Sequence, residues 1–195
     1  MNRRDFLKYA ALTTFGVMCF DGGLDSLRAE AASDLAEPPI YKRLLTFTEY
    51  EARASTEMIV VHHAGFPDAD RDSTALEIHK FHQQDLGWAG IGYHYLIRKD
   101  GMIEQGRRPN AVGAHAYQHN KNSIGICVAG NFNIGEPTEA QMQSVETLIG
   151  WLCRKYSLDP LKRGVIIGHR DLNDTSCPGE NFYERLSHIR REAAR

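Results

Sequence analysis

The sequence predicts a single-domain α/β fold, with a mixed central β-sheet and helices on both faces. Short runs of β-branched and apolar residues alternate with longer segments whose apolar residues recur at helical spacing. A hairpin interrupts this alternation, so the sheet is expected to be mixed instead of purely parallel. The 195 residues, 42% hydrophobic and 25% charged, are typical of one globular domain and not of a fibrous or disordered chain.

Residues 1–31 are expected to form an export signal that is removed from the mature protein. Arg3 and Arg4 precede a moderately apolar stretch, residues 9–20, and small residues surround Ala31. The adjacent arginines indicate the twin-arginine route; the alternative is a chance arginine pair in an ordinary secretory signal. We therefore expect an exported protein, in the periplasm or elsewhere in the cell envelope.

The folded domain is expected to span residues 58–195. Residues 32–57 are polar and irregular, which favours an N-terminal extension or linker with a short helix near Thr48–Ala54. The apolar, β-branched run Met58–Val61 predicts the first buried strand, which ends at His62.

A helix is predicted to begin after Thr74, because Thr74 and Glu77 form a possible capping box. Gly87 is expected to end this helix. Its apolar face is predicted to contain Ala75, Ile78, His82 and Leu86.

Four further segments complete the predicted sheet and its hairpin. Residues 91–97 predict a strand, and the turn at residues 99–101 leads into a second one at Met102-Ile103. Buried strands are also expected at residues 123–129 and 165–167.

Two more helices are predicted in the C-terminal third. Thr138 and Gln141 form a second capping box, and residues 181–192 predict the terminal helix. The helix after Thr138 carries Met142, Val145, Leu148, Ile149 and Leu152 at helical spacing.

Charge and hydropathy exclude two classes of partner. The net charge of −2 argues against a nucleic-acid binder that depends on a basic face. No uncharged apolar run reaches the roughly 20 residues of a spanning helix, so no stable membrane insertion is expected after signal removal. The domain is expected to be a monomer.

Cysteine usage points to a thiol with a special role. Cys127, Cys153 and Cys177 remain after signal removal, and an odd number cannot pair fully within one chain. Cys127 and Cys153 can pair or both stay reduced, because the sequence does not set their separation. At least one thiol needs another function, and a metal ligand is an obvious candidate.

Two histidine-containing strand ends supply the remaining donors for a metal site. One histidine of His62-His63, together with His169 and Cys177, forms the set of three protein ligands that a catalytic zinc uses. Each residue alone is also explained by packing, since a strand-end histidine is usually hydrogen-bonded and a lone cysteine is often a small buried hydrophobe.

A longer series of ordered motifs resembles the zinc-dependent N-acetylmuramoyl-L-alanine amidases, a family that includes phage lysozyme-type amidases and peptidoglycan recognition proteins. The resemblance covers roughly residues 58–190, which makes it far more specific than any single motif. The motifs are Val60-Val61-His62-His63-Ala64, Phe81-His82, the run from Gly87 to Ile97, Gly113-Ala114-His115, Asn122 to Ile126, Gly130-Asn131-Phe132, Gly168-His169-Arg170-Asp171 and Cys177-Pro178-Gly179.

The resemblance implies a role for each candidate site residue. His62, His169 and Cys177 match the family's zinc ligands, and Tyr93 matches its catalytic tyrosine. Thr175 stands where the family carries Lys or Thr.

Other histidines and an aromatic residue near these motifs receive weaker assignments. His115 is expected to contact substrate, with a satisfied surface histidine as the alternative. His63 and His82 are expected to pack or hydrogen-bond, and Trp88 is expected in the core.

The implied activity is zinc-dependent hydrolysis of the amide between N-acetylmuramic acid and L-alanine in peptidoglycan or muropeptides. Zinc would activate water and polarise the carbonyl. Tyr93 would position the water and donate a hydrogen bond in the transition state, since a phenol with a pKa of about 10 is a poor unaided base. Zinc, Thr175 and the Tyr93 hydroxyl are the candidates for stabilising the oxyanion. The alternatives are a non-catalytic peptidoglycan-binding module and a zinc hydrolase that acts on another amide.

Overall fold

The structure is a computed structural model that describes residues 36–195. Residues Glu37–Arg195 form one compact unit. The expected export signal, residues 1–31, lies outside the described residues. Within the described part of the chain, no helix has both the length and the apolar surface needed to cross a bilayer.

A six-stranded mixed sheet forms the centre of this unit, in the order β1-β4-β3-β5-β2-β6. Neighbouring strands run parallel except for the antiparallel hairpin of β3 and β4. The mixed sheet predicted from the sequence is therefore confirmed. The strands are β1 (Ile40–Lys42), β2 (Met58–His63), β3 (Tyr95–Ile97), β4 (Ile103–Gln105), β5 (Ser123–Val128) and β6 (Ile166–Gly168).

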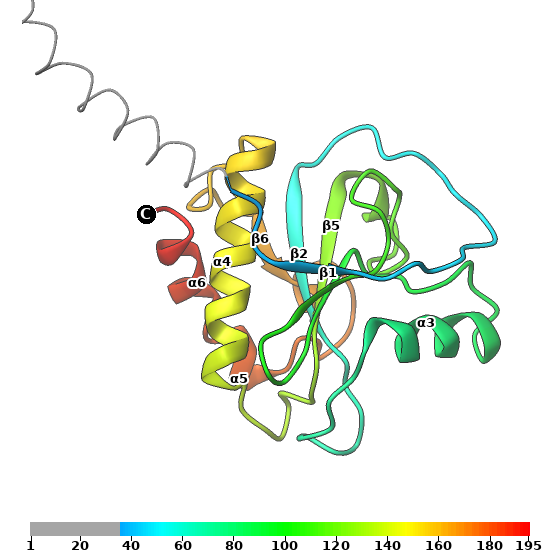
Figure 1. The fold of residues 1–195 in the computed structure, drawn as a ribbon. Helices are drawn as coiled ribbons and strands as arrows, with labels where there is room; N and C mark the ends of the chain where they lie inside the picture. The colour runs from blue at the N-terminus through cyan, green and yellow to red at the C-terminus, as the bar shows by residue number, and fades with distance from the viewer. Residues whose placement is uncertain (1–35) are drawn as a thin grey trace, which may run out of the picture. The chain divides into compact units, whose positions relative to one another are not determined.

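Helices cover both faces of the sheet, as predicted (Figure 1). Helices α4 and α6 lie together against one face, and α3 lies on the other side. The helices are α3 (Ala75–Gln84), α4 (Glu139–Tyr156), α5 (Glu180–Tyr183) and α6 (Leu186–Glu192), with 3-10 turns at Asn120–Asn122 and His169–Asp171.

Side-chain alternation along β2 decides which face receives His62. Ile59 and Val61 belong to the apolar core beneath α4 and α6. His62 points the opposite way, because successive side chains of a strand alternate between faces. Its partner in the register is Cys127, which belongs with Leu96 to the smaller core on the α3 face. The functional side chain is therefore directed away from the main core.

Both predicted capping boxes are present. The Thr74 hydroxyl accepts the Glu77 N–H at 3.2 Å, and the Glu77 carboxylate accepts the Thr74 N–H at 2.8 Å. Thr138 and Gln141 make the same reciprocal pair at the start of α4. Each box satisfies N–H groups that have no partner within the helix.

The predicted helix near Thr48–Ala54 is wrong. This segment is extended and makes its backbone hydrogen bonds with distant parts of the chain. Thr48 N–H donates to Ala89, Arg53 N–H donates to Asn110, and Glu51 accepts the Val112 N–H. Upstream of it, residues 40–42 form the edge strand β1, which the sequence analysis did not predict.

Three smaller expectations also need correction. The predicted terminal helix over residues 181–192 is two helices, α5 and α6, and side chains of both enter the main core. Helix α3 ends at Gln84, so Leu86 lies beyond it and is 44% exposed. Trp88 is 42% exposed and is not a core residue.

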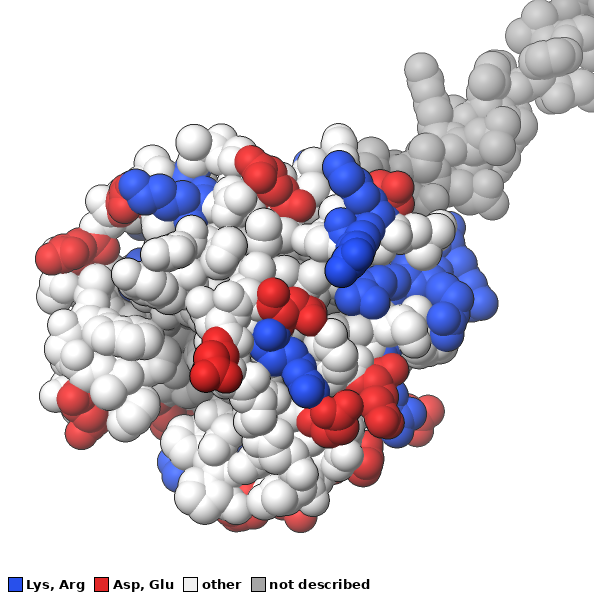
Figure 2. Space-filling view, turned by 180° about the vertical axis from the view of Figure 1, so that it is seen from behind, with Lys and Arg blue, Asp and Glu red and all other residues white. Residues whose placement is uncertain are grey.

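Acidic and basic side chains both occur on the face shown in Figure 2. Basic groups gather toward one side of this face, with acidic groups beside them. This mixture is in keeping with the net charge of −2.

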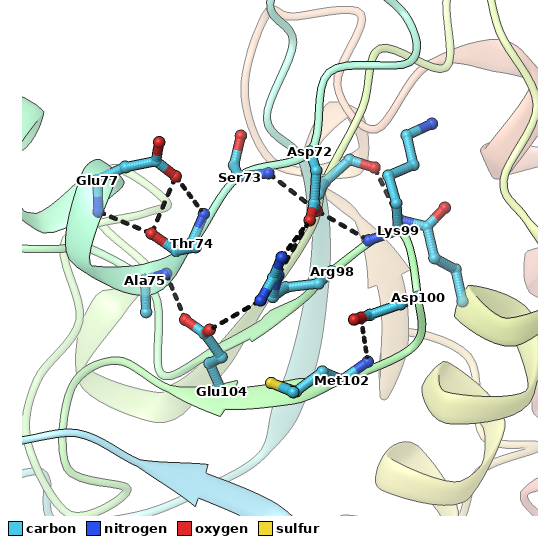
Figure 3. Close-up of polar contacts among 12 residues, drawn as sticks. Asp72, Ser73, Thr74, Ala75, Glu77, Arg98, Lys99, Asp100, Met102 and Glu104 are labelled. Atoms are coloured by element: carbon cyan, nitrogen blue, oxygen red, sulfur yellow. Dashed lines mark hydrogen bonds and ion pairs between the residues drawn. The ribbon is translucent and has the colours of Figure 1, made fainter.

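A polar network ties the start of α3 to the β3–β4 hairpin (Figure 3). The Asp72 carboxylate accepts hydrogen bonds from the Arg98 guanidinium at 2.7 and 3.0 Å and from the Lys99 N–H at 2.9 Å. Glu104 is only 3% exposed, and its carboxylate accepts the Ala75 N–H at 2.6 Å. The hairpin thus caps the helix from outside the helix's own sequence.

Two buried histidines brace the loops on the α3 face. His94 accepts the Gly125 N–H at Nδ1 and donates from Nε2 to the Ala111 carbonyl, both at 2.9 Å. His79 accepts the Ile91 N–H in the same way. Burial lowers the pKa of His94 to about 3, and it also lowers the pKa of His79. Both imidazoles are therefore neutral in the folded protein at neutral pH.

We expect Glu104→Ala to lower the free energy of unfolding by about 2–3 kcal/mol, because it leaves the buried Ala75 N–H without a partner. Asp100→Ala, on the same hairpin, is the matched control. Its carboxylate accepts only the exposed Met102 N–H, so a change within about 0.5 kcal/mol is expected. Urea unfolding at pH 7 measures both, and equal losses would contradict the capping role of Glu104.

The neutral state of His94 predicts a loss of stability in acid. The unfolded chain takes up a proton near pH 6.5, whereas folded His94 does so only near pH 3. The contribution of His94 to the free energy of unfolding is therefore greatest well above pH 6.5. It falls by about 2–3 kcal/mol between pH 7.5 and 4.5.

The control for this prediction is His94→Asn, whose Oδ1 can still accept the Gly125 N–H. Unfolding free energies of both proteins are measured across this pH range under identical conditions, so that other titrating groups contribute equally. The variant should be less stable at pH 7.5 and show a shallower decline near pH 5, by about 1.4 kcal/mol per pH unit. Parallel pH curves would refute the assignment.

Candidate metal centre

Two neighbouring parallel strands bring the histidines of the site together. Strands β2 and β6 pair with Val61 opposite Gly168. The residue that follows each of these two is a histidine: His62, which is still within β2, and His169, which comes directly after β6. Their ring centroids lie 4.5 Å apart. The parallel register therefore joins two residues that are more than a hundred positions apart in the sequence.

The loop after β6 folds back to add the cysteine. Arg170 N–H donates to the Cys177 carbonyl at 2.8 Å, which closes the loop. Asp171 anchors its beginning, because its carboxylate accepts the Gly168 N–H at 2.9 Å and the Tyr183 hydroxyl at 2.6 Å. The Cys177–Pro178 peptide bond is cis.

His62, His169 and Cys177 present three donor atoms within 4.8 Å of one another. The Cys177 Sγ lies 3.7 Å from His62 Nδ1. Ligands of a tetrahedral zinc, each about 2.0–2.3 Å from the ion, are about 3.5 Å apart, so this spacing fits. Two imidazoles and one thiolate are also a donor set that zinc accepts while a fourth position stays open.

Burial makes these donors neutral without a cation. Burial holds the pKa of His62 well below its ordinary value, and the nearby His169 adds to this effect. Burial also lowers the pKa of His169 and raises that of Cys177 to about 12. The imidazole lone pairs are thus available, and a bound cation would supply the charge that favours the thiolate.

Each candidate ligand also has a hydrogen-bond partner outside the set. His62 Nε2 lies 3.0 Å from Nδ1 of His115. His169 Nε2 lies 3.0 Å from Oδ1 of Asn173. The backbone N–H of His63 donates to the Cys177 sulfur at 3.4 Å. Such outer contacts orient metal ligands before the metal binds.

Tyr93 lies beside the ligands. Its ring centroid is 5.1 Å from that of His62. Burial raises the pKa of the Tyr93 hydroxyl well above its ordinary value, and the sulfurs of Cys127 and Cys177 add to the shift. The phenol is therefore protonated at neutral pH and can act as a hydrogen-bond donor but not as a base.

Thr175 lies in the loop after β6, two residues before Cys177. Its hydroxyl oxygen accepts the Cys177 N–H at 3.2 Å, which leaves its O–H free to donate. Thr175 and Tyr93 both line a cleft of about 480 Å³. Other residues lining this cleft are Trp88, His115, Tyr117 and His169.

His115 is a buried residue and not a surface histidine. Its side chain is only 8% exposed, and its ring lines the cleft wall. Its two nitrogens face other protein groups: Nδ1 lies against His62, and Nε2 lies 3.4 Å from the Ser123 hydroxyl.

Cys127 and Cys153, the other two cysteines in the described part of the chain, do not form a disulfide. Cys127 and Cys153 are both free and buried. Cys127 belongs to the core on the α3 face, whereas Cys153 of α4 belongs to the core on the opposite face. The sheet therefore separates them.

The chain is similar in sequence and in structure to known proteins. The model of the family described as N-acetylmuramoyl-L-alanine amidase matches residues 52–180. The chain belongs to this family. The membership confirms the resemblance carried by the sequence motifs.

Curated relatives of this amidase-family chain include peptidoglycan-recognition proteins and phage endolysins. Peptidoglycan-recognition protein LB of Drosophila melanogaster is 31% identical over 159 residues, which cover 74% of this chain and 68% of the relative. The endolysin of Enterobacteria phage T3 is 36% identical over 135 residues, which cover 67% of this chain and 85% of the endolysin.

Solved structures show the same fold. An endolysin N-acetylmuramoyl-L-alanine amidase from Clostridium intestinale matches with a TM-score of 0.70 and 37% identity, over 78% of this chain and 95% of that one. Wild-type Drosophila PGRP-LB matches with a TM-score of 0.68 and 30% identity, over 76% and 92% of the two chains.

Two neighbours of the site, Asn173 and Cys127, were not predicted from the sequence. Asn173 follows His169 by four residues, and its N–H donates to the His169 carbonyl at 3.1 Å, so a helical turn places it over the ligand. That spacing was the available signal. Cys127 lies near Tyr93 only because β5 pairs with β2 and β3, which local sequence does not reveal.

We expect Cys177→Ser to abolish stoichiometric zinc binding, because it removes the only sulfur of the donor set. Metal analysis of the purified protein measures this directly. Cys153→Ala is the matched control, since Cys153 lies on the far face of the sheet, and it should keep one zinc per chain. Equal zinc content in Cys177→Ser and the wild type would refute the ligand assignment.

Proposed function

We propose that this chain cleaves the amide between N-acetylmuramic acid and L-alanine with zinc held by His62, His169 and Cys177. Membership of the N-acetylmuramoyl-L-alanine amidase family makes the protein an enzyme of peptidoglycan amide hydrolysis. The observation that carries the zinc proposal is the convergence of three donor atoms within 4.8 Å. Two of these residues come from adjacent strand ends, and His169 also lines the cleft.

Bound zinc would lower the pKa of a water toward about 7 and polarise the scissile carbonyl. The chain's own residues would then stabilise the charge that develops on the carbonyl oxygen. Tyr93 is protonated and can donate one hydrogen bond. Thr175 can donate another. Its hydroxyl oxygen accepts the Cys177 N–H, and that bond does not use the hydroxyl proton. Donors fixed in a cleft before the reaction are effective because they need little reorganisation.

The substrate is proposed to be peptidoglycan or a muropeptide derived from it. A mutant of Drosophila PGRP-LB in complex with tracheal cytotoxin matches this chain with a TM-score of 0.68 and 30% identity. This similarity supports a ligand from the cell wall. It does not favour a non-catalytic recognition module, because the complete donor set is what catalysis requires and mere binding does not.

We further propose that the protein is exported to the periplasm through a twin-arginine signal and acts there as a monomer. The paired Arg3 and Arg4 and the small residues around Ala31 support export. Peptidoglycan as the substrate is in keeping with this location.

We expect Tyr93→Phe and Thr175→Val to keep zinc but to lower kcat by about 10²–10³-fold, because each removes one oxyanion donor. The measurement combines metal analysis with dye release from labelled cell walls. Tyr41→Phe, a matched removal of a hydroxyl on the exposed edge strand β1, should leave both values unchanged.

The outcomes of this assay also separate the alternatives. Chelator should abolish dye release, and added zinc should restore it. Tight wall binding without turnover would instead support a recognition module. Turnover of another amide, identified by the new amine and the released sugar, would indicate a different zinc hydrolase.

A further inference from the structure

We propose that His115 and Asn173 are positioning residues that hold His62 and His169 as Nδ1 ligands and so set the affinity for the metal. This inference rests on the zinc centre proposed above and concerns residues outside its donor set. It also revises the substrate-contact role that the sequence favoured for His115. The support comes from two separate hydrogen-bond chains that meet at one loop.

The first chain begins at His62. Its Nδ1 lies 3.7 Å from the Cys177 sulfur, so this nitrogen faces the donor set, and Nε2 faces Nδ1 of His115 at 3.0 Å. A metal on Nδ1 leaves the proton on Nε2, which must then donate. His115 Nδ1 accepts that proton's hydrogen bond, and its Nε2–H points to the Ser123 hydroxyl at 3.4 Å. Ser123 in turn donates to the His119 carbonyl at 2.6 Å.

This first chain has one consistent direction. Each group accepts from one neighbour and donates to the next, and the chain ends on a carbonyl that can only accept. His62, His115 and Ser123 are all buried, so water cannot substitute easily for a lost partner. The arrangement therefore selects one tautomer of His62, the one with the Nδ1 lone pair toward the metal position.

The second chain begins at His169. Its Nε2 donates to Oδ1 of Asn173 at 3.0 Å, which leaves Nδ1 for the metal. The Asn173 amide nitrogen donates to the Tyr117 carbonyl at 3.4 Å. Asn173 is thus held between the ligand and the loop on the other side of the cleft.

Both chains end on the same loop, residues 115–120. The loop is fixed internally, because the Asn120 side chain accepts the N–H groups of His115 and Ala116 at 2.8 and 3.0 Å. His62 is hydrogen-bonded to His115 of this loop. His169 is connected to the loop through Asn173, which donates to the Tyr117 carbonyl. One rigid loop therefore orients two ligands that come from different strands.

This arrangement also accounts for the nitrogens of His115. One accepts from His62 and the other donates to Ser123, so neither is left for a substrate when the metal is bound. His115 is nevertheless one of the residues that line the cleft. Its polar function is directed to the metal ligand.

The experiment measures zinc affinity by competition with a chelating indicator, in paired variants of the full mature protein. His115→Leu and Asn173→Leu remove the acceptors and should weaken zinc binding about 10–100-fold. His115→Asn and Asn173→Asp keep an oxygen near the position of the lost acceptor and should retain most of the affinity. His119→Ala is the control from the same loop. In the described chain no hydrogen bond or ring contact joins its imidazole to either ligand, so affinity should be unchanged.

A second readout reports the tautomers directly. Long-range proton–nitrogen NMR of the zinc-loaded wild type should show both ligand imidazoles protonated at Nε2. The leucine variants should show mixed tautomers in the absence of zinc. Asn173 is only partly buried, so its variants test the proposal even where a change at buried His115 prevents folding.

Each result has a defined meaning. Leucine variants that bind zinc as tightly as the wild type, with unchanged tautomers, would overturn the positioning role and leave the proposed amidase intact. A wild type that binds no zinc would overturn both proposals. Weaker binding that the Asn and Asp variants rescue would support the positioning role, because a general packing defect would not follow acceptor chemistry.

Discussion

The parallel pairing of β2 with β6 is the constraint on which the site depends. It places Val61 opposite Gly168, so the residues that follow, His62 and His169, emerge side by side at one edge of the sheet. A shift of one residue in this register would turn His62 into the core beneath α4 and leave His169 alone. The main apolar core, which holds β2 and β6 against α4 and α6, therefore also fixes the position of the candidate metal ligands His62 and His169.

Burial and hydrogen bonding act together around the donor set. Burial keeps the imidazoles neutral and raises the pKa of the Cys177 thiol, so all three donor groups are uncharged at neutral pH. A bound cation would instead favour the thiolate form of Cys177. The Cys177 sulfur already accepts a hydrogen bond from the His63 N–H. His115 and Asn173, outside the donor set, lie within hydrogen-bond distance of the two imidazoles. These contacts are the basis of the positioning role proposed for them.

The cleft is lined both by aromatic side chains and by hydroxyl groups near the candidate metal ligands. Trp88 and Tyr117 form exposed aromatic walls, while Tyr93 and Thr175 offer hydroxyl groups close to the ligands. Relatives of the chain include both recognition proteins and endolysins, so the fold alone does not decide between binding and hydrolysis. The ligands make the difference, because a cell-wall fragment can be held without a metal but not hydrolysed by the route proposed here.

Elements whose signals are local could be predicted from the amino-acid sequence. Apolar runs marked the buried strands, Thr74 and Thr138 marked two helix starts, and ordered motifs marked His62, His169 and Cys177 as one site. Elements that depend on distant partners were missed. Residues 48–54 are extended because their backbone bonds to residues 89 and 110–112, and β1 exists because it pairs with β4. The contacts of His115 with His62 and of Asn173 with His169 are visible only in the folded structure, since hydrogen bonds between side chains depend on orientation and distance that sequence spacing does not contain.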